Sequence, residues 1–325
     1  MTWWIPNLVS NAKRAHVVSD FNFKDMLSSS IRSMIAYKSQ GDVYELWAKA
    51  NTGASIKQTE DAAEAEEAEE AAEAAESKKE TAAELAKESP TDDADMSVER
   101  LLLQELQHIE HEPVLLESDA DAQCYVWIKV TTAYVTFRGT SSIEDALADA
   151  NVLTWNFPNG VKIHRGFYTQ FLSIRDRLYE WLGQACTEDI TCIHFAGHSL
   201  GAALAQIAAH HFGPIFTRMQ IQCSTIGCPR TGNTAFAQSF ERVVTQNMRV
   251  ANSNDPVTMI PLSFRWWHTF NKCMVIDDDC NVKYVKSDIP WYYRIFMCAK
   301  DIDYNSVIHD HTCDTYVARL MRLSR

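Results

Sequence analysis

The sequence lacks long apolar runs, which limits the kinds of protein it can encode. No stretch of the 325 residues reaches the roughly 18 consecutive apolar residues typical of a membrane-spanning helix. The first residues, MTWWIPNLVSNAKRAHVV, also lack a charged segment followed by an apolar core of about 7–15 residues. We therefore expect no membrane span, no signal peptide and a cytoplasmic location.

Cysteine spacing typical of metal or redox motifs is missing too. The chain has nine cysteines, an odd number, and no two of them are arranged as C-x-x-C. Together with the expected lack of a signal peptide, this favours reduced, mostly buried thiols in a reducing compartment. One alternative stays open, in which Cys273 and Cys280 bridge two neighbouring strands.

Outside one segment, the chain has almost no net charge. The formal net charge is −13, but residues 57–95 contain 15 acidic and 4 basic side chains, a net of −11. The rest of the chain therefore carries only −2. Such a nearly neutral surface offers no electrostatic footprint for nucleic acid or for an anionic membrane.

The acidic segment has too few apolar side chains to pack as a helix. Alanine and glutamate favour helices, but like-charged glutamates recur at i,i+4 spacing, as in Glu66 and Glu70. Between residues 61 and 95 the only large apolar residue is Leu85. We interpret residues 56–95 as a solvated insertion that is disordered or a frayed helix. Alternatively, it contacts a basic partner.

The insertion divides the chain into two further parts. Residues 1–55 are expected to form an N-terminal helical segment that packs on the core, because Met26, Ile31, Met34 and Ile35 follow a broken helical stripe. Residues 96–325 are expected to form the main domain.

Glycine is scarce, with 11 residues in the chain, yet two of these flank Ser199 in the pentapeptide GHSLG. One interpretation is a tight turn without further meaning. The other is a nucleophile elbow of the form G-x-S-x-G, in which a sharp strand-to-helix turn exposes the serine hydroxyl. The small residues after Ser199 favour the elbow, because strand and helix nearly touch there.

The surrounding pattern supports this second interpretation. Apolar β-rich runs at 124–130, 133–137, 189–195, 219–226 and 248–253 alternate with helical patterns at 98–109, 166–183, 201–211, 234–244 and 315–323, and two more strands fit within 272–285. Such alternation predicts an α/β fold with a mostly parallel central sheet flanked by helices. Ser199 falls between a strand and a helix, as the elbow requires.

A serine nucleophile needs a histidine base and a carboxylate that orients this base. In this fold class the chain order is serine, acid, histidine. Asp255 lies in a loop after the second strand beyond Ser199, although it could also be an ordinary turn residue. Asp277, Asp278 and Asp279 are weaker candidates, because three adjacent acids suggest an exposed hairpin turn.

Three histidines follow Asp255 and could be the base, namely His268, His309 and His311. His268 is only 13 residues beyond Asp255, before the next element. His198 is next to the serine, but neighbouring positions in a sharp turn are expected to point apart. Residues 309–313, HDHTC, could instead hold a metal ion if a further ligand came from elsewhere.

Six segments between about residues 124 and 320 resemble motifs of the class 3 lipase family, which includes fungal triacylglycerol lipases. They are VTFRGTSS (135–142), IHRGF (163–167), GHSLG (197–201), IGCPRTGNTAFAQSF (226–240), NSNDPVTMIP (252–261) and DHTCDTY (310–316). The resemblance implies an α/β-hydrolase fold, with residues 96–325 as the catalytic domain.

The resemblance also implies site residues. Ser199, Asp255 and His311 match the family's catalytic triad, while Thr140 and Leu200 match its oxyanion hole. His268 resembles a different family histidine that is not the base. No metal or organic cofactor is implied.

The implied activity is hydrolysis of fatty-acyl esters of glycerolipids through an acyl-enzyme intermediate. The segment 141–155 corresponds to the family's lid and could bring the protein into transient contact with a membrane or lipid-droplet surface; it could also be a plain surface helix. The alternatives are a phospholipase A1-type or short-chain esterase, a peptidase or thioesterase, and an inactive lipid-binding scaffold.

Overall fold

The structure is a computed structural model that describes residues 23–51, 92–139, 153–261, 266, 273–285 and 309–324. In these ranges lies an eight-stranded sheet with the order β1-β2-β3-β6-β7-β8-β9-β10. Its strands are β1 (Val114–Glu117), β2 (Gln123–Lys129), β3 (Thr132–Phe137), β6 (Cys192–His198), β7 (Gln220–Ile226), β8 (Gln246–Asn252), β9 (Cys273–Ile276) and β10 (Val282–Val285). A separate two-stranded sheet pairs β4 (Thr154–Asn156) with β5 (Lys162–His164).

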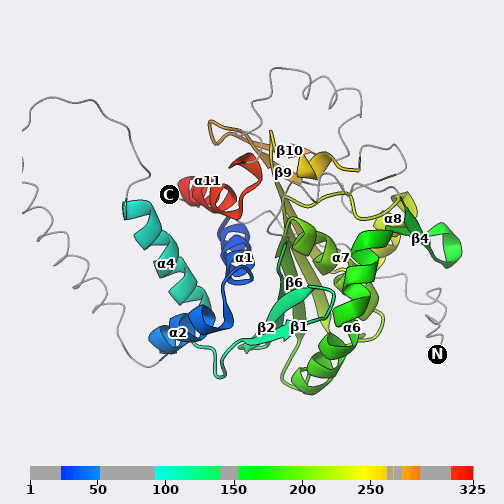
Figure 1. The fold of residues 1–325 in the computed structure, drawn as a ribbon, viewed down its shortest axis with the longest axis horizontal. Helices are drawn as coiled ribbons and strands as arrows, with labels where there is room; N and C mark the ends of the chain where they lie inside the picture. Colours follow the sequence, from blue (N-terminus) through cyan, green and yellow to red (C-terminus); the bar gives the residue numbers. More distant parts are fainter. Residues whose placement is uncertain are drawn as a thin grey trace, which may run out of the picture.

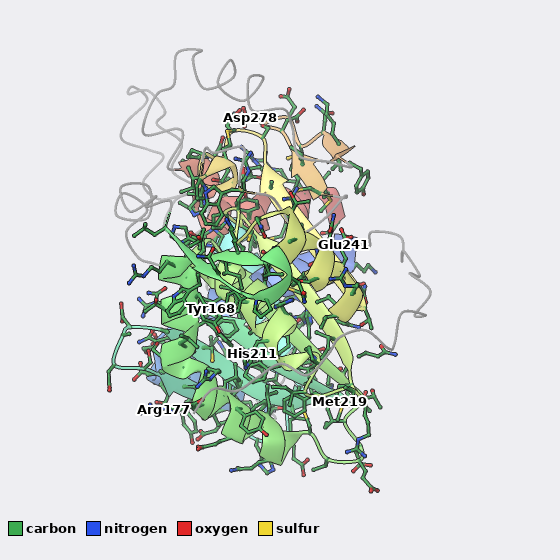
Figure 2. The ribbon with its side chains drawn as sticks, turned by 90° about the vertical axis from the view of Figure 1, so that its right-hand side faces the viewer. Tyr168, Arg177, His211, Met219, Glu241 and Asp278 are labelled. Atoms are coloured by element: carbon green, nitrogen blue, oxygen red, sulfur yellow. The ribbon has the colours of Figure 1, made fainter. Side chains whose placement is uncertain are left out.

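The middle of the large sheet is parallel. Strands β3, β6, β7, β8 and β9 pair in parallel, whereas β1-β2-β3 and β9-β10 pair antiparallel at the two edges. The predicted mostly parallel α/β sheet is therefore confirmed. Met219, just before β7, and Asp278, just after β9, lie at opposite ends of the molecule (Figure 2). The carboxyl ends of the parallel strands thus face the Asp278 end, where open α/β sheets carry their sites.

Helices cover both faces of this sheet (Figure 1). One face carries α1 (Phe23–Ile35), α2 (Gln40–Asn51), α4 (Asp92–Leu106) and α11 (Cys313–Ser324), and the other carries α6 (Arg165–Ala185), α7 (Leu200–Phe212) and α8 (Thr234–Val243). Each layer has its own apolar core. Phe171 and Phe212 belong to the α6–α7 core, and Met26 and Tyr316 belong to the α1–α11 core.

Helix α1 packs closely against the sheet because much of its inner face is small. Ser29, Ser30 and Ser33 are completely buried. The hydroxyls of Ser30 and Ser33 donate to the carbonyls of Met26 and Ser29, each at 3.0 Å, so their burial leaves no donor unused. Helix α1 ends at Ile35, and the hydroxyl of Tyr37, two residues later, contacts His198 at the carboxyl end of β6.

The larger helices and strands lie near their predicted positions, with some differences. The strand predicted at 189–195 runs instead from Cys192 to His198 and continues into the serine turn. The short strands β1, β4 and β5 were not predicted. Cys273 and Cys280 both carry thiols rather than a disulfide; they lie at opposite ends of β9, at its start and in the turn beyond it.

Two predicted features fall largely outside the described ranges. They are the acidic insertion, of which only the start of α4 from Asp92 is described, and most of the lid segment. Of the lid segment's last residues, Trp155 lies in β4. No helix in the described part of the chain is long and apolar enough to cross a bilayer.

Candidate active site

Ser199 lies in the sharp turn between β6 and α7. Its backbone has φ 58° and ψ −127°, a conformation that costs a residue other than glycine about 1–3 kcal/mol. The two flanking glycines allow this turn. A Cβ on Gly197 would overlap the backbone of Gly201, and a Cβ on Gly201 would overlap the carbonyl oxygen of Phe137. The motif GHSLG therefore has the strand–turn–helix geometry expected of an elbow.

His311 and Asp255 lie beside this turn. The Nε2 atom of His311 is 2.7 Å from the Oγ atom of Ser199. Its Nδ1 atom is 2.8 Å and 2.9 Å from the two carboxylate oxygens of Asp255. Asp255 and His311 are fully buried, and Ser199 is only 2% exposed. The structure thus brings together three residues that are more than 50 positions apart along the chain.

These contacts fix where the protons lie. A carboxylate only accepts hydrogen bonds, so the Nδ1 atom of His311 carries the hydrogen and donates it to Asp255. The Nε2 atom is then an acceptor for the Ser199 hydroxyl. A histidine in this state can take the proton of the serine.

The carboxylate of Asp255 is held by two further donors. The backbone N–H of Val257 donates to Oδ1 at 2.9 Å, and the Tyr316 hydroxyl donates to Oδ2 at 2.6 Å. Tyr316 also accepts a bond from the backbone N–H of Asn252 at 2.8 Å. Burial, with Asp255 beside it, raises the pKa of Tyr316 well above its usual value, so the phenol stays protonated and donates.

Asp310, the residue before His311, is hydrogen-bonded by two other side chains. The Asn252 side chain donates to the carbonyl of Asp310 at 2.8 Å. Arg319 on α11 donates to the Asp310 carboxylate at 2.6 Å and to Asp278 in the β9–β10 turn at 2.7 Å. These contacts connect the end of β8, the β9–β10 turn, α11 and the residues just before α11.

Two residues next to the site were not singled out as part of it from the sequence. His198 was expected to point away, but its ring centroid is 4.7 Å from that of His311, and its Nε2 atom is 2.7 Å from the His311 carbonyl oxygen. The Tyr37 hydroxyl is 2.8 Å from the Nδ1 atom of His198. The 161 positions between Tyr37 and His198 give no local signal for this contact.

The remaining predicted site residues have different outcomes. Leu200 is the first residue of α7, whose first N–H groups have no partner within the helix. Thr140, His268 and residues 141–152 lie outside the described residues. Gly139, just before Thr140, packs against the Tyr37 hydroxyl and the His198 carbonyl, where a Cβ would not fit.

The competing acids and the residues considered as metal ligands are bonded to groups of the protein itself. Asp277 accepts bonds from the backbone of Asp279 and Asn281, as in a hairpin turn. In the stretch 309–313, Asp310 pairs with Arg319 while His311 contacts Ser199. Among the described residues, no three histidine, cysteine or acidic side chains are grouped as metal ligands.

Sequence comparisons point to one family. Residues 134–264 match the family model described as lipase (class 3). The chain is 28% identical over 147 residues to a chloroplastic phospholipase A(1) of Arabidopsis thaliana, covering 39% of this chain and 33% of that protein. It is 28% identical over 171 residues to a lipase of Rhizopus niveus, covering 50% and 43%. The alignments thus span less than half of these relatives' lengths.

Solved structures show the same architecture. The Rhizomucor miehei triacylglyceride lipase matches with a TM-score of 0.54 and 21% identity, over 64% of this chain and 81% of that one. Lipase II from Rhizopus niveus matches with a TM-score of 0.51 and 26% identity, over 62% and 78%. The matched segment, residues 134–264, thus resembles the class 3 lipase family, and the described fold agrees with that of the solved lipases.

Proposed function

We propose that this protein is a serine lipase that hydrolyses fatty-acyl esters of glycerolipids, with Ser199, His311 and Asp255 as its catalytic triad. The observation that carries the proposal is the position of the His311 ring. One nitrogen contacts Ser199 at 2.7 Å and the other contacts Asp255 at 2.8 Å, in a fully buried arrangement at an elbow. The match of residues 134–264 to the lipase (class 3) model supports ester hydrolysis as the reaction class.

In the proposed reaction, His311 takes the proton of Ser199 as the serine oxygen attacks the ester carbonyl. Asp255 holds the histidine in the required tautomer and stabilises its cation. The negative oxygen of the tetrahedral intermediate accepts bonds from the Leu200 N–H at the start of α7 and from Thr140, as the family resemblance implies. His311 then protonates the departing alcohol, and water releases the fatty acid by the same steps.

Two substrate classes are supported by relatives. The Rhizopus and Rhizomucor relatives are named lipases, which favours acylglycerols. The Arabidopsis relative is named a phospholipase A(1), which makes a glycerophospholipid ester the second candidate.

We also propose transient contact with a lipid surface near β4. Leu153 and Trp155, at the end of the predicted lid segment, are 49% and 42% exposed there. Large exposed apolar side chains of this kind insert readily at a lipid boundary.

The test is a substrate panel measured on the full chain and on Ser199→Ala. The panel contains p-nitrophenyl esters of increasing chain length, mono-, di- and triacylglycerols, and phospholipids. The proposal expects hydrolysis of at least one glycerolipid, reduced about a thousandfold or more in Ser199→Ala. Preference for phospholipids would select the second candidate. Hydrolysis that survives in Ser199→Ala, or no hydrolysis of any ester, would contradict the proposal.

A further inference from the structure

His198 contacts the main chain of His311, whereas Asp255 contacts its ring. Its Nε2 atom lies 2.7 Å from the His311 carbonyl oxygen, and both residues are buried. A carbonyl oxygen only accepts, so the Nε2 atom of His198 carries a hydrogen and donates it. His311 is thus held at its ring by Asp255 and at its backbone by His198.

Tyr37 contacts the other ring nitrogen of His198 and favours the same tautomer. Its hydroxyl is 2.8 Å from the Nδ1 atom. Since Nε2 is already a donor, a neutral His198 has an unprotonated Nδ1 that accepts the Tyr37 O–H. Burial raises the pKa of Tyr37 well above its usual value, so the hydroxyl retains its proton and remains a donor.

His198 must stay uncharged for His311 to act as a base. When His311 takes the serine proton it becomes a cation, and its ring centroid is only 4.7 Å from that of His198. A second cation there would oppose this step. Burial, followed by the nearness of His311, lowers the pKa of His198 well below 6.5. Within the described residues, the titratable or charged groups near these two histidines include Asp255, bonded to His311, Tyr316, next to His198, and Arg138 and Cys313, near Tyr37.

Tyr37 comes from a part of the chain outside the family match. It follows α1, whereas the match begins at residue 134. Its hydroxyl also lies against Gly139, one residue before the predicted oxyanion-hole residue Thr140. The N-terminal segment therefore contacts the proposed catalytic centre directly.

We propose that Tyr37 and His198 form a positioning pair for His311, in which Tyr37 keeps His198 in its neutral Nε2–H form and His198 holds the His311 backbone. The pair keeps the His311 ring aligned with Ser199 and keeps a competing positive charge away from it. This inference rests on the proposed function of the triad.

The first test compares Tyr37→Phe with Tyr125→Phe. Tyr125 is a matched control because it is also a buried tyrosine with a hydrogen-bonded hydroxyl. Its hydroxyl donates to the carbonyl of Lys38 at 3.2 Å and has no contact with His198 or the triad. Tyr37→Phe is expected to lower kcat about ten- to a hundredfold with little change in KM. The acid limb of its pH–rate profile is expected to move to higher pH, because His198 then protonates more readily. Tyr125→Phe is expected to leave kcat and the acid limb of the pH–rate profile unchanged.

The second test asks whether Tyr37 acts through His198. Glutamine at position 198 can still donate to the His311 carbonyl but cannot be protonated. In the His198→Gln background, Tyr37→Phe is therefore expected to change kcat less than about twofold and to leave the acid limb in place. Effects that multiply in the double variant would overturn the proposal, as would a Tyr37→Phe profile that matches Tyr125→Phe.

Histidine NMR on the unaltered chain keeps the proposal testable even if a variant fails to fold. The ¹⁵N shifts of His198 are expected to show an Nε2–H ring that stays neutral as the pH is lowered through the usual histidine range. An Nδ1–H ring at His198, or a His198 ring that becomes protonated near the usual histidine pKa of about 6.5, would overturn the proposal. If the unaltered chain hydrolyses no ester, the proposed function fails; if it is active but Tyr37→Phe has no effect, only this inference fails.

Discussion

The side chains around Asp255 leave almost no free space. Its carboxylate receives bonds from Val257, Tyr316 and His311, and it is completely buried. Gly227, at the end of β7, has φ 57°, and a Cβ there would lie 3.0 Å from Asp255 Oδ2 and 3.2 Å from His311 Cε1. The Asp255 carboxylate cannot move away without losing its hydrogen bonds, so even a methyl group at Gly227 would disturb the site.

Gly227→Ala tests this crowding. The substitution adds a Cβ at a positive φ and presses on both Asp255 and His311, so ester hydrolysis should fall about a hundredfold through misplaced groups. The measurement is kcat together with the thermal midpoint, with Gly183→Ala as control, because a Cβ there meets open space. Full activity in Gly227→Ala would contradict the geometry described for Asp255.

Tyr316→Phe tests the hydrogen bond that orients Asp255. Loss of the hydroxyl removes one donor to Asp255 and leaves the Asn252 N–H without its acceptor. The free energy of unfolding should drop by about 1–3 kcal/mol, and kcat should fall while KM stays near its original value. Urea unfolding and steady-state kinetics give the two quantities, and unchanged values of both would count against this role.

At the scale of helices and strands, two segments far apart in the sequence must lie side by side for the triad to form. Asp255 follows β8, and His311 precedes α11. Arg319 of α11 connects them by binding Asp310 and Asp278, while Asn254 binds Asp278 at 2.9 Å. The side chains of Arg319 and Asp310 are 11% and 5% exposed, so their ion pair is largely shielded from water.

Arg319→Met should therefore separate these segments. It leaves the buried Asp310 carboxylate without its partner, which costs about 3 kcal/mol in the free energy of unfolding, and it should lower kcat as His311 loses its support. Arg319→Lys should lower the free energy of unfolding and kcat less than Arg319→Met does. Arg322→Met, on the exposed side of the same helix, is the control; an equal effect in the control would argue against a specific role for Arg319.

The sequence predicts this architecture well where local patterns carry the information. The apolar spacing of α6, the small residues of α7 and the glycines around Ser199 all correspond to observed features. Ser199, Asp255 and His311 could be selected because a motif, a chain order and a family resemblance all limit the choice. Their catalytic role stays a prediction until activity is measured.

Other features depend on contacts that no local pattern encodes. Tyr37 resembles any residue after a helix, and its contact with His198 exists only because the buried serines let α1 lie against the sheet. His198 was set aside on the geometry of sharp turns, which describes its backbone but not where its ring ends. The strands β4 and β5, with three residues each, are too short for periodicity to reveal.

Across the molecule, several histidines are buried or half-buried, and this favours their neutral form. Burial lowers the pKa of His210 and of His211 to about 4. His210 packs against Phe236 and bonds to Ser239, and His211, visible on the α7 side in Figure 2, packs against Phe171. In an unfolded chain these histidines would titrate near pH 6.5.

This difference predicts how stability depends on pH. Between about pH 6.5 and 4 the unfolded chain binds more protons than the folded one, so the free energy of unfolding should fall as the pH drops through this range. Urea unfolding from pH 7.5 to 4.5 measures it. His210→Gln should show a smaller fall, whereas the exposed His111→Gln should behave like the original chain. A stability that stays constant down to pH 4.5 would contradict buried, neutral histidines.

The most direct test of the triad is the site at which a fluorophosphonate probe reacts. Peptide mass spectrometry of the labelled chain should find the phosphonyl group on Ser199 alone. The labelling rate should fall at least a hundredfold in His311→Asn, because the serine loses its base. Labelling at another residue, no labelling at all, or an unchanged rate in His311→Asn would contradict the account.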